Sequence, residues 1–167
     1  MTPLSNTEIC SSLGYNESDI IPYSKLSEYK SIQELLPEDK SFKILLLEEA
    51  PNRGHFVCLY RQDDLIVYFN SYGEKPDRDM KCIPRCIRKM LGEDRPEITR
   101  LCDGMKIWYN DRRLQGKDTQ TCGRYCVFAI EMMKMGYSPD QVLEALSKHK
   151  ERTGYSTYDE VICSITP

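Results

Sequence analysis

The stretch from Gln115 to Met133 constrains the fold more than any other part of the sequence. Its second half carries apolar side chains at the helical spacing of four, four and three residues: Cys122, Cys126, Ile130 and Met133. Its first half, QGKDTQT, is polar and typical of a turn that satisfies the free N–H groups of a helix start. The pattern therefore predicts an apolar helix that begins at or just after Cys122.

A cysteine at the start of a helix is a candidate nucleophile. The helix dipole and the unpaired amides of the first turn favour a thiolate over a thiol, and a buried helix would hold the sulfur rigidly. The plainer interpretation is that Cys122 is a small core residue, because free cysteines usually pack in the interior. This segment alone leaves both interpretations open.

Composition narrows the class of protein. The chain has 167 residues, of which 40% are hydrophobic and 29% charged, which is typical of one globular domain spanning 1–167. A net charge of -3 gives no reason to expect nucleic acid as a partner. The sequence has neither a signal-peptide pattern nor an apolar run of the roughly 20 residues that a membrane span needs. We therefore expect a monomer inside the cell, with no membrane partner.

The sequence contains eight cysteines and two histidines. Without a secretory signal, we interpret the cysteines as reduced thiols of a cytoplasmic or nuclear setting. Two pairs have the spacing C-x-x-x-C, at Cys82 and Cys86 and at Cys122 and Cys126, which is not the spacing of a standard zinc finger or ribbon. We therefore expect no metal and no other cofactor.

Periodicity and turn residues predict blocks of helices and strands. Residues 1–16 look irregular, with a short helical turn at most. The remaining elements are a helix over 24–36, strands over 42–49, 54–60 and 65–70, a helix over 79–92, short strands over 98–101 and 105–109, and helices from 122, over 138–150 and over 158–164. This order predicts an α+β fold.

A thiolate nucleophile needs a base within hydrogen-bond reach and a group that orients that base. His149 lies in the charged segment SKHKE, whereas His55 opens an apolar strand. If the hairpin turn is centred between Gln62 and Asp63, His55 lies directly opposite Asn70 on the same face of the sheet. Asn70 could then orient one imidazole nitrogen and leave the other for the cysteine. A slip of one residue would separate the pair.

The remaining requirement is a donor for the oxyanion of a tetrahedral intermediate. Gln115, seven residues before Cys122, can supply its side-chain amide, and the backbone N–H of Cys122 can serve as a second donor. Taken alone, Gln115 is an ordinary loop residue.

These segments together resemble a known family. GHF at 54–56, NSYG at 70–73 and LQGKDTQTCGRYC at 114–126 resemble, in that order, the adenovirus-protease and ubiquitin-like-protease group of cysteine peptidases. The stretch from 109 to 126 is most similar to the maturation proteases of virophages, Maverick-type elements and large DNA viruses. The last motif is fairly specific, and the first two are weak by themselves.

The resemblance implies a role for each matching residue. Cys122 would be the nucleophile, His55 the general base, Asn70 the orienting residue and Gln115 the oxyanion donor. Phe56 and Gly123 would line the substrate groove. The implied fold is an α+β cysteine-protease fold, in which a central helix carries the nucleophile and packs on a mixed or antiparallel sheet.

The sequence departs from the family at two of these positions. Phe56 stands where many members have tryptophan, which changes the shape of the groove. Asn70 stands where many members have Asp or Glu, and an amide supplies no charge to stabilise imidazolium.

The function that the resemblance implies is a cysteine endopeptidase. It would process capsid or other virion precursor proteins after small residues, such as Gly-Gly or Gly-x-Gly, in the virion and in the host cytoplasm or nucleus. A protein substrate is then the main partner, and a peptide activator is left open. The alternatives are a protease specific for ubiquitin-like proteins and a catalytically inactive relative that binds peptides.

Overall fold

The computed structural model describes residues 3–50 and 53–167. Its central feature is a mixed sheet of five strands in the order β1–β2–β3–β4–β5. Strands β2, β3 and β4 run antiparallel, while β1 is parallel to β2 and β5 is parallel to β4. The strands span Ile20–Pro22, Phe42–Ala50, Arg53–Gln62, Leu65–Phe69 and Lys106–Tyr109.

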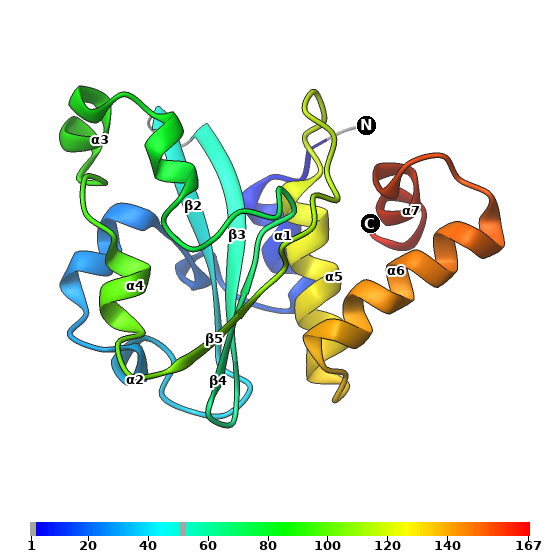
Figure 1. The fold of residues 1–167 in the computed structure, drawn as a ribbon, viewed down its shortest axis with the longest axis horizontal. Helices are drawn as coiled ribbons and strands as arrows, with labels where there is room; N and C mark the ends of the chain where they lie inside the picture. Colours follow the sequence, from blue (N-terminus) through cyan, green and yellow to red (C-terminus); the bar gives the residue numbers. More distant parts are fainter. Residues whose placement is uncertain (1–2, 51–52) are drawn as a thin grey trace.

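Helices cover both faces of this sheet (Figure 1). The α-helices are α1 (Asn6–Leu13), α2 (Ile32–Leu35), α3 (Arg85–Leu91), α4 (Glu97–Leu101), α5 (Cys122–Lys134), α6 (Pro139–Thr153) and α7 (Tyr158–Ile165). Three 3₁₀ turns accompany them: η1 (Glu17–Asp19), η2 (Tyr23–Glu28) and η3 (Asp79–Cys82). Helices α1, α5, α6 and α7 lie on one side of the sheet, and η2, α2, α3 and α4 lie on the other. This confirms the predicted α+β class and the mixed sheet.

The central strands are apolar on both faces because both faces are covered. On β3, Cys58 and Tyr60 pack into the core beneath α5, and the alternate residues Val57 and Leu59 pack into the core on the opposite face. A sheet with two covered faces produces the nearly continuous apolar runs of β2, β3 and β4. Those runs are why the sequence located these strands to within a few residues.

Helix α5 begins at Cys122, as predicted, and packs against β3. Two other helices also match their predictions. The side chain of Ser138 caps α6 in a reciprocal pair with Gln141, and Thr157 caps α7 in the same way. Helix α1 is longer than the short turn that the sequence indicated, because Ser5 caps it through Glu8.

The predicted helix over 24–36 is wrong. The segment forms η2 and the short helix α2, with extended backbone between them. The guanidinium of Arg100 donates to the carbonyls of Leu26 and Tyr29, at 3.0 Å each. A distant side chain thus takes the acceptors that a continuous helix would have used.

Two predictions in the middle of the chain also fail. The predicted helix over 79–92 is divided into η3 and α3, because Pro84 forces Ile83 into extended backbone. The predicted strand over 98–101 is the helix α4. The carboxylate of Asp77 caps this helix from another loop by accepting from the backbone N–H groups of Ile98 and Thr99.

The hairpin exists, but its register is two residues away from the predicted one. Leu59 lies opposite Tyr68, and the turn is centred on Asp63 and Asp64. Asp63 adopts a left-handed φ of 50° there. Because side chains alternate with a period of two, a two-residue shift keeps every side chain on its predicted face. His55 and Asn70 therefore still share a face, as diagonal neighbours.

Candidate functional site

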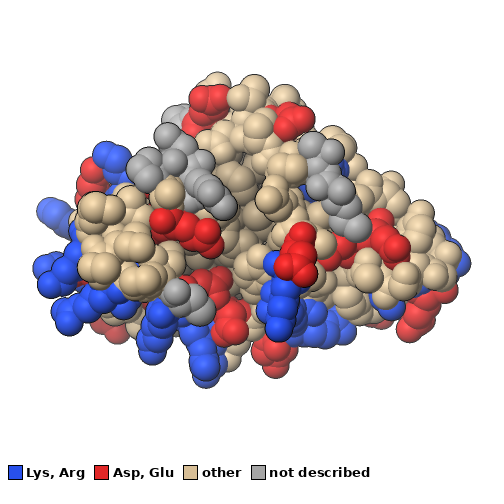
Figure 2. Space-filling model, turned by 90° about the horizontal axis from the view of Figure 1, so that it is seen from above, with Lys and Arg blue, Asp and Glu red and all other residues tan. Residues whose placement is uncertain are grey.

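A groove of about 760 Å³ lies between the start of α5 and the first residues of β3. Its other walls come from residues 3–6 and from the loop 115–120. Figure 2 looks onto this end of the molecule, where the surface is hollowed. The groove is lined by all the predicted site residues except Asn70: His55, Phe56, Gln115, Cys122 and Gly123. Asn70 is fully buried.

His55 and Asn70 are in direct contact. The imidazole Nε2 lies 2.8 Å from the Asn70 Oδ1. The backbone of Asn70 is held in turn by Asn110, whose Oδ1 accepts from the Asn70 N–H and whose Nδ2 donates to its carbonyl. The predicted pairing of the two residues is confirmed, and it leaves the imidazole Nδ1 for the groove.

An aromatic ring supports the imidazole from one face. The ring of Tyr72 stacks on His55 with a centroid distance of 4.3 Å and an interplanar angle of 18°. The guanidinium of Arg113 lies 4.6 Å from the centre of the same tyrosine ring. The three groups form a stack that restricts rotation of the imidazole.

The sulfur of Cys122 lies where several backbone N–H groups converge. Those of Phe56, Gly123 and Cys122 itself act on the thiol and lower its pKa, but burial has the larger effect and raises it above the ordinary value. Burial likewise lowers the pKa of His55 to about 4, against smaller opposing effects of the Asn70 hydrogen bond and Glu49. In the free protein both groups are therefore neutral near pH 7. The N–H groups at the helix start act on the thiol in the expected direction, but burial outweighs them.

Gln115 is buried and held at both ends of its amide. Its Oε1 accepts from the Ser71 hydroxyl at 2.6 Å, and its Nε2 donates to the Thr119 carbonyl at 2.7 Å. An amide nitrogen carries two protons, so one N–H of Gln115 remains for an acceptor in the groove. This fixed orientation is what an oxyanion donor requires.

Gly123 has a packing role that the sequence did not reveal. A Cβ on this residue would lie 2.9 Å from the Ile9 side chain of α1. The absence of a side chain lets α1 approach the start of α5. Phe56 is partly buried and lines the groove directly.

A carboxylate on α7 organises the loop that precedes Cys122. Asp159 accepts from the backbone N–H of Gly116 at 2.8 Å, and from the hydroxyls of Thr119, Thr121 and Tyr125. Sequence reasoning missed this residue because nothing local connects a C-terminal helix to position 122. The repeated threonines before the cysteine were the only signal, and they indicate hydroxyl donors without naming the acceptor.

Sequence reasoning also missed Tyr72 and Asp79. Tyr72 lies within the NSYG motif, so its place beside the imidazole could have been inferred from the motif. Asp79 lies outside this motif, and the sequence placed it at the start of the predicted helix over 79–92. In the structure, its Oδ2 accepts from the Asn70 Nδ2 at 2.6 Å.

Three further observations concern the described residues. All seven cysteines whose side chains are described are free thiols. Over the same residues, no three His, Cys, Asp or Glu side chains gather as metal ligands would. None of the described helices combines the length and the apolar character needed to cross a lipid bilayer.

Comparisons place the chain among known proteins. The sequence matches no protein-family model. The "uncharacterized protein V9" of Sputnik virophage is 33% identical over 172 residues, covering 98% of this chain and 89% of the relative. The crystal structure of ASFV pS273R protease matches 74% of this chain and 51% of its own chain, at 14% identity and a TM-score of 0.42. That score is too low to support a conclusion. The identity and coverage with the virophage protein show that this chain belongs to the V9 family of Sputnik virophage.

Proposed function

We propose that the protein is a cysteine endopeptidase of the adenovirus-protease and ubiquitin-like-protease type, which processes virion precursor proteins after small residues. The observation that carries the proposal is the convergence of Cys122, His55 and Gln115 on one groove, with Asn70 bonded to the far side of the imidazole. These groups supply the nucleophile, base, orienting residue and oxyanion donor that thiol proteolysis needs. Kinship with a virophage protein supports the viral setting.

The reaction begins from the neutral pair. The imidazole Nδ1 of His55 takes the thiol proton as the Cys122 sulfur attacks the scissile carbonyl carbon. The developing oxyanion is held by the free N–H of Gln115 and the backbone N–H of Cys122. His55 then gives its proton to the leaving amine as the C–N bond breaks. Water, deprotonated by the same imidazole, hydrolyses the thioester and regenerates the thiol.

The decisive experiment is cleavage of a peptide library that samples small residues on either side of the scissile bond. The wild-type protein should cut after glycine, and Cys122→Ala should lose all activity while its melting temperature stays within a few degrees. The matched control is Cys86→Ala, because Cys86 is exposed on α3, away from the groove, and should keep full activity. Cleavage that survives Cys122→Ala would refute the proposal.

One observation favours a second candidate, a relative that binds peptides without cutting them. The imidazole of His55 is oriented by the neutral amide of Asn70, which supplies no charge to stabilise the imidazolium that forms during catalysis. Stoichiometric binding of library peptides with no product, and no labelling of Cys122 by a peptide electrophile, would select this candidate. Labelling by an electrophile on a ubiquitin-like protein, but not on short peptides, would instead select a ubiquitin-like-protein protease.

A further inference from the structure

A buried amide lies between the imidazole of His55 and a carboxylate. Asn70 receives hydrogen bonds at its Oδ1 from His55, at 2.8 Å, and from the backbone N–H of Tyr72, at 2.9 Å. On its other side, its Nδ2 donates to the Asp79 Oδ2 at 2.6 Å. The three residues form a chain from His55 through Asn70 to Asp79.

The orientation of this amide decides which imidazole nitrogen can act as a base. With Oδ1 toward the ring, Nε2 must carry the proton that it donates, and Nδ1 keeps its lone pair for the groove. If the amide turned over, its NH₂ group would face Nε2, the proton would move to Nδ1, and the base would be lost. Two partners exclude the turned-over amide: the N–H of Tyr72 requires an acceptor at Oδ1, and the Asp79 carboxylate requires a donor at Nδ2.

We propose that Asp79 is a positioning residue that fixes the Asn70 amide and thereby keeps His55 in the tautomer with a free Nδ1. This inference rests on the proposed function. It explains how an asparagine can occupy the orienting position. Many members of the family that the sequence resembles have a carboxylate directly against the imidazole. Here the carboxylate of Asp79 contacts the imidazole only through the Asn70 amide.

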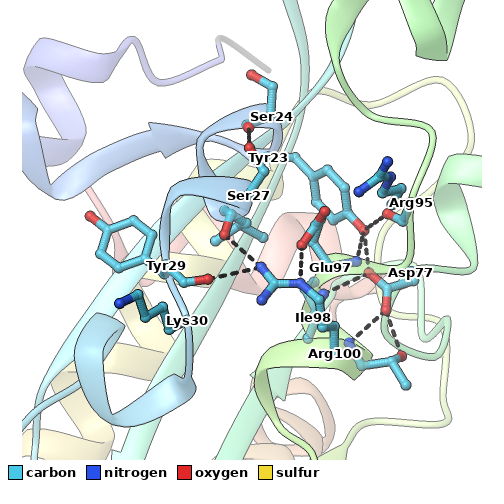
Figure 3. A network of polar contacts seen from close by, with 12 residues as sticks. Tyr23, Ser24, Ser27, Tyr29, Lys30, Asp77, Arg95, Glu97, Ile98 and Arg100 are labelled. Carbon is cyan, nitrogen blue, oxygen red and sulfur yellow. Dashed lines mark hydrogen bonds and ion pairs between the residues drawn. The ribbon is translucent and has the colours of Figure 1, made fainter.

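A separate network of hydrogen bonds around Asp77 holds the loop that precedes Asp79 (Figure 3). Asp77 precedes it by two residues and has a left-handed φ of 67°. Its carboxylate accepts from the Tyr23 hydroxyl, the backbone N–H groups of Ile98 and Thr99, and the Thr99 hydroxyl. These bonds hold an otherwise unfavourable backbone conformation, so Asp79 is presented to Asn70 from a rigid support.

Other charged groups also face these residues. Glu49 raises the pKa of His55 and Arg113 lowers it. Burial raises the pKa of Asp79, the Asn70 hydrogen bond lowers it, and Glu74 and Arg113 have smaller opposing effects. A pH profile alone would mix all of them, and the test therefore reads the tautomer directly.

The first measurement is the tautomer of His55 in the free protein, from long-range ¹H–¹⁵N NMR spectra. The wild type should show the proton on Nε2. Asp79→Asn keeps the size of the side chain but offers both a donor and an acceptor, so only the Tyr72 N–H still favours the original orientation of the amide. Signals of a minor population with the other tautomer should therefore appear. The double variant Asn70→Asp with Asp79→Asn exchanges the two groups, places a carboxylate against Nε2–H and should restore the wild-type tautomer.

The second measurement is the rate at which a peptide electrophile labels Cys122. We expect Asp79→Asn to lower the rate about tenfold, less than the roughly 10²–10⁴-fold that a general base contributes, and Asp79→Ala to lower it further. The exchanged pair should recover to within about threefold of wild type. Glu74→Gln is the matched control: Glu74 also faces Asp79 but forms an exposed ion pair with Arg78, and its loss should change neither readout.

The outcomes separate this inference from the proposed function. An unchanged tautomer in Asp79→Asn, or a loss of labelling that the exchanged pair does not recover, would overturn the positioning role. A protein that never cleaves or labels, yet shifts its tautomer as expected, would refute the protease and keep the positioning role.

Discussion

Two buried or half-buried carboxylates support opposite sides of the groove, and their surroundings differ. Asp159 lies beneath the Cys122 side and accepts from one backbone N–H and three hydroxyls. Asp79 lies behind the His55 side, where Asn70 is its side-chain donor, and it lines a second cavity of about 340 Å³. The first carboxylate has its hydrogen-bonding capacity filled by the loop that it organises. The Asp79 carboxylate borders the second cavity and is connected through Asn70 to His55, the proposed base.

This difference indicates that similar residues have separate tasks at the two sides. A carboxylate surrounded by donors stabilises a loop, and its removal strands several buried groups. A carboxylate that reaches the reactive ring through one amide contributes less to stability and more to the state of that ring. We therefore expect changes at Asp159 to appear in unfolding experiments and changes at Asp79 to appear in the tautomer and labelling experiments.

The largest expected effect is that of Asp159→Ala on stability. The substitution leaves the donors of Gly116, Thr121 and Tyr125 without their acceptor, and we expect a loss of about 3 kcal/mol or more in the free energy of unfolding. Urea unfolding followed by circular dichroism measures it. Asp103→Ala, at an exposed turn, is the control and should stay within about 0.5 kcal/mol of wild type.

A loss as small as that of the control would remove the contrast between the two carboxylates. An Asp79→Asn variant that loses as much stability as Asp159→Ala would also remove the contrast, because Asp79 would then act mainly by stabilising the fold.

The sequence predicted the parts of the fold whose signals are local. Strands β2, β3 and β4, and helices α5, α6 and α7, each have an apolar period or a capping residue within their own segment. The helix over 24–36 and the strand over 98–101 failed because distant side chains decide both. Arg100 binds backbone carbonyls of the segment that was predicted as one helix. Asp77 caps α4, the helix that forms where a strand was predicted. No window of a single segment contains that information.

The candidate site divides in the same way. His55 and Asn70 were paired correctly despite a register that is wrong by two residues, because only a slip of one residue exchanges the faces of a strand. Cys122 and Gln115 follow from a motif within one short segment. Asp79 and Asp159 lie 9 and 38 positions from the site residues Asn70 and Thr121 that they contact, and only the folded chain places them there.

Glu93 provides a smaller test, because it is a buried carboxylate with incomplete pairing. Its Oε1 accepts from the Glu48 N–H at 2.9 Å, whereas its Oε2 has no hydrogen-bond partner within the described residues. Burial raises its pKa to about 7. The native state therefore binds its proton more tightly than the unfolded chain does, and stability is lost as pH rises from about 4.5 through 7.

Glu93→Gln removes this pH-dependent cost. We expect little change in the free energy of unfolding at pH 5 and a gain of about 2 kcal/mol at pH 8. Urea unfolding at the two pH values measures it, and Asp94→Asn, at the exposed neighbouring residue, should show no such difference. An equal effect of Glu93→Gln at both pH values would mean that the carboxylate is already compensated in the native state.

The finest test concerns the thiol itself. Because burial raises the pKa of Cys122 more than the surrounding N–H groups lower it, the rate of its alkylation by iodoacetamide should have a midpoint above the ordinary thiol pKa of about 8.5. Peptide mass spectrometry follows Cys122 at each pH. Asp79→Asn should barely move this midpoint, since Asp79 acts on the imidazole and the resting thiol is neutral. A midpoint well below the ordinary thiol pKa, displaced upward by Asp79→Asn, would instead reveal a thiolate–imidazolium pair in the free protein, with the carboxylate acting through charge and not through orientation.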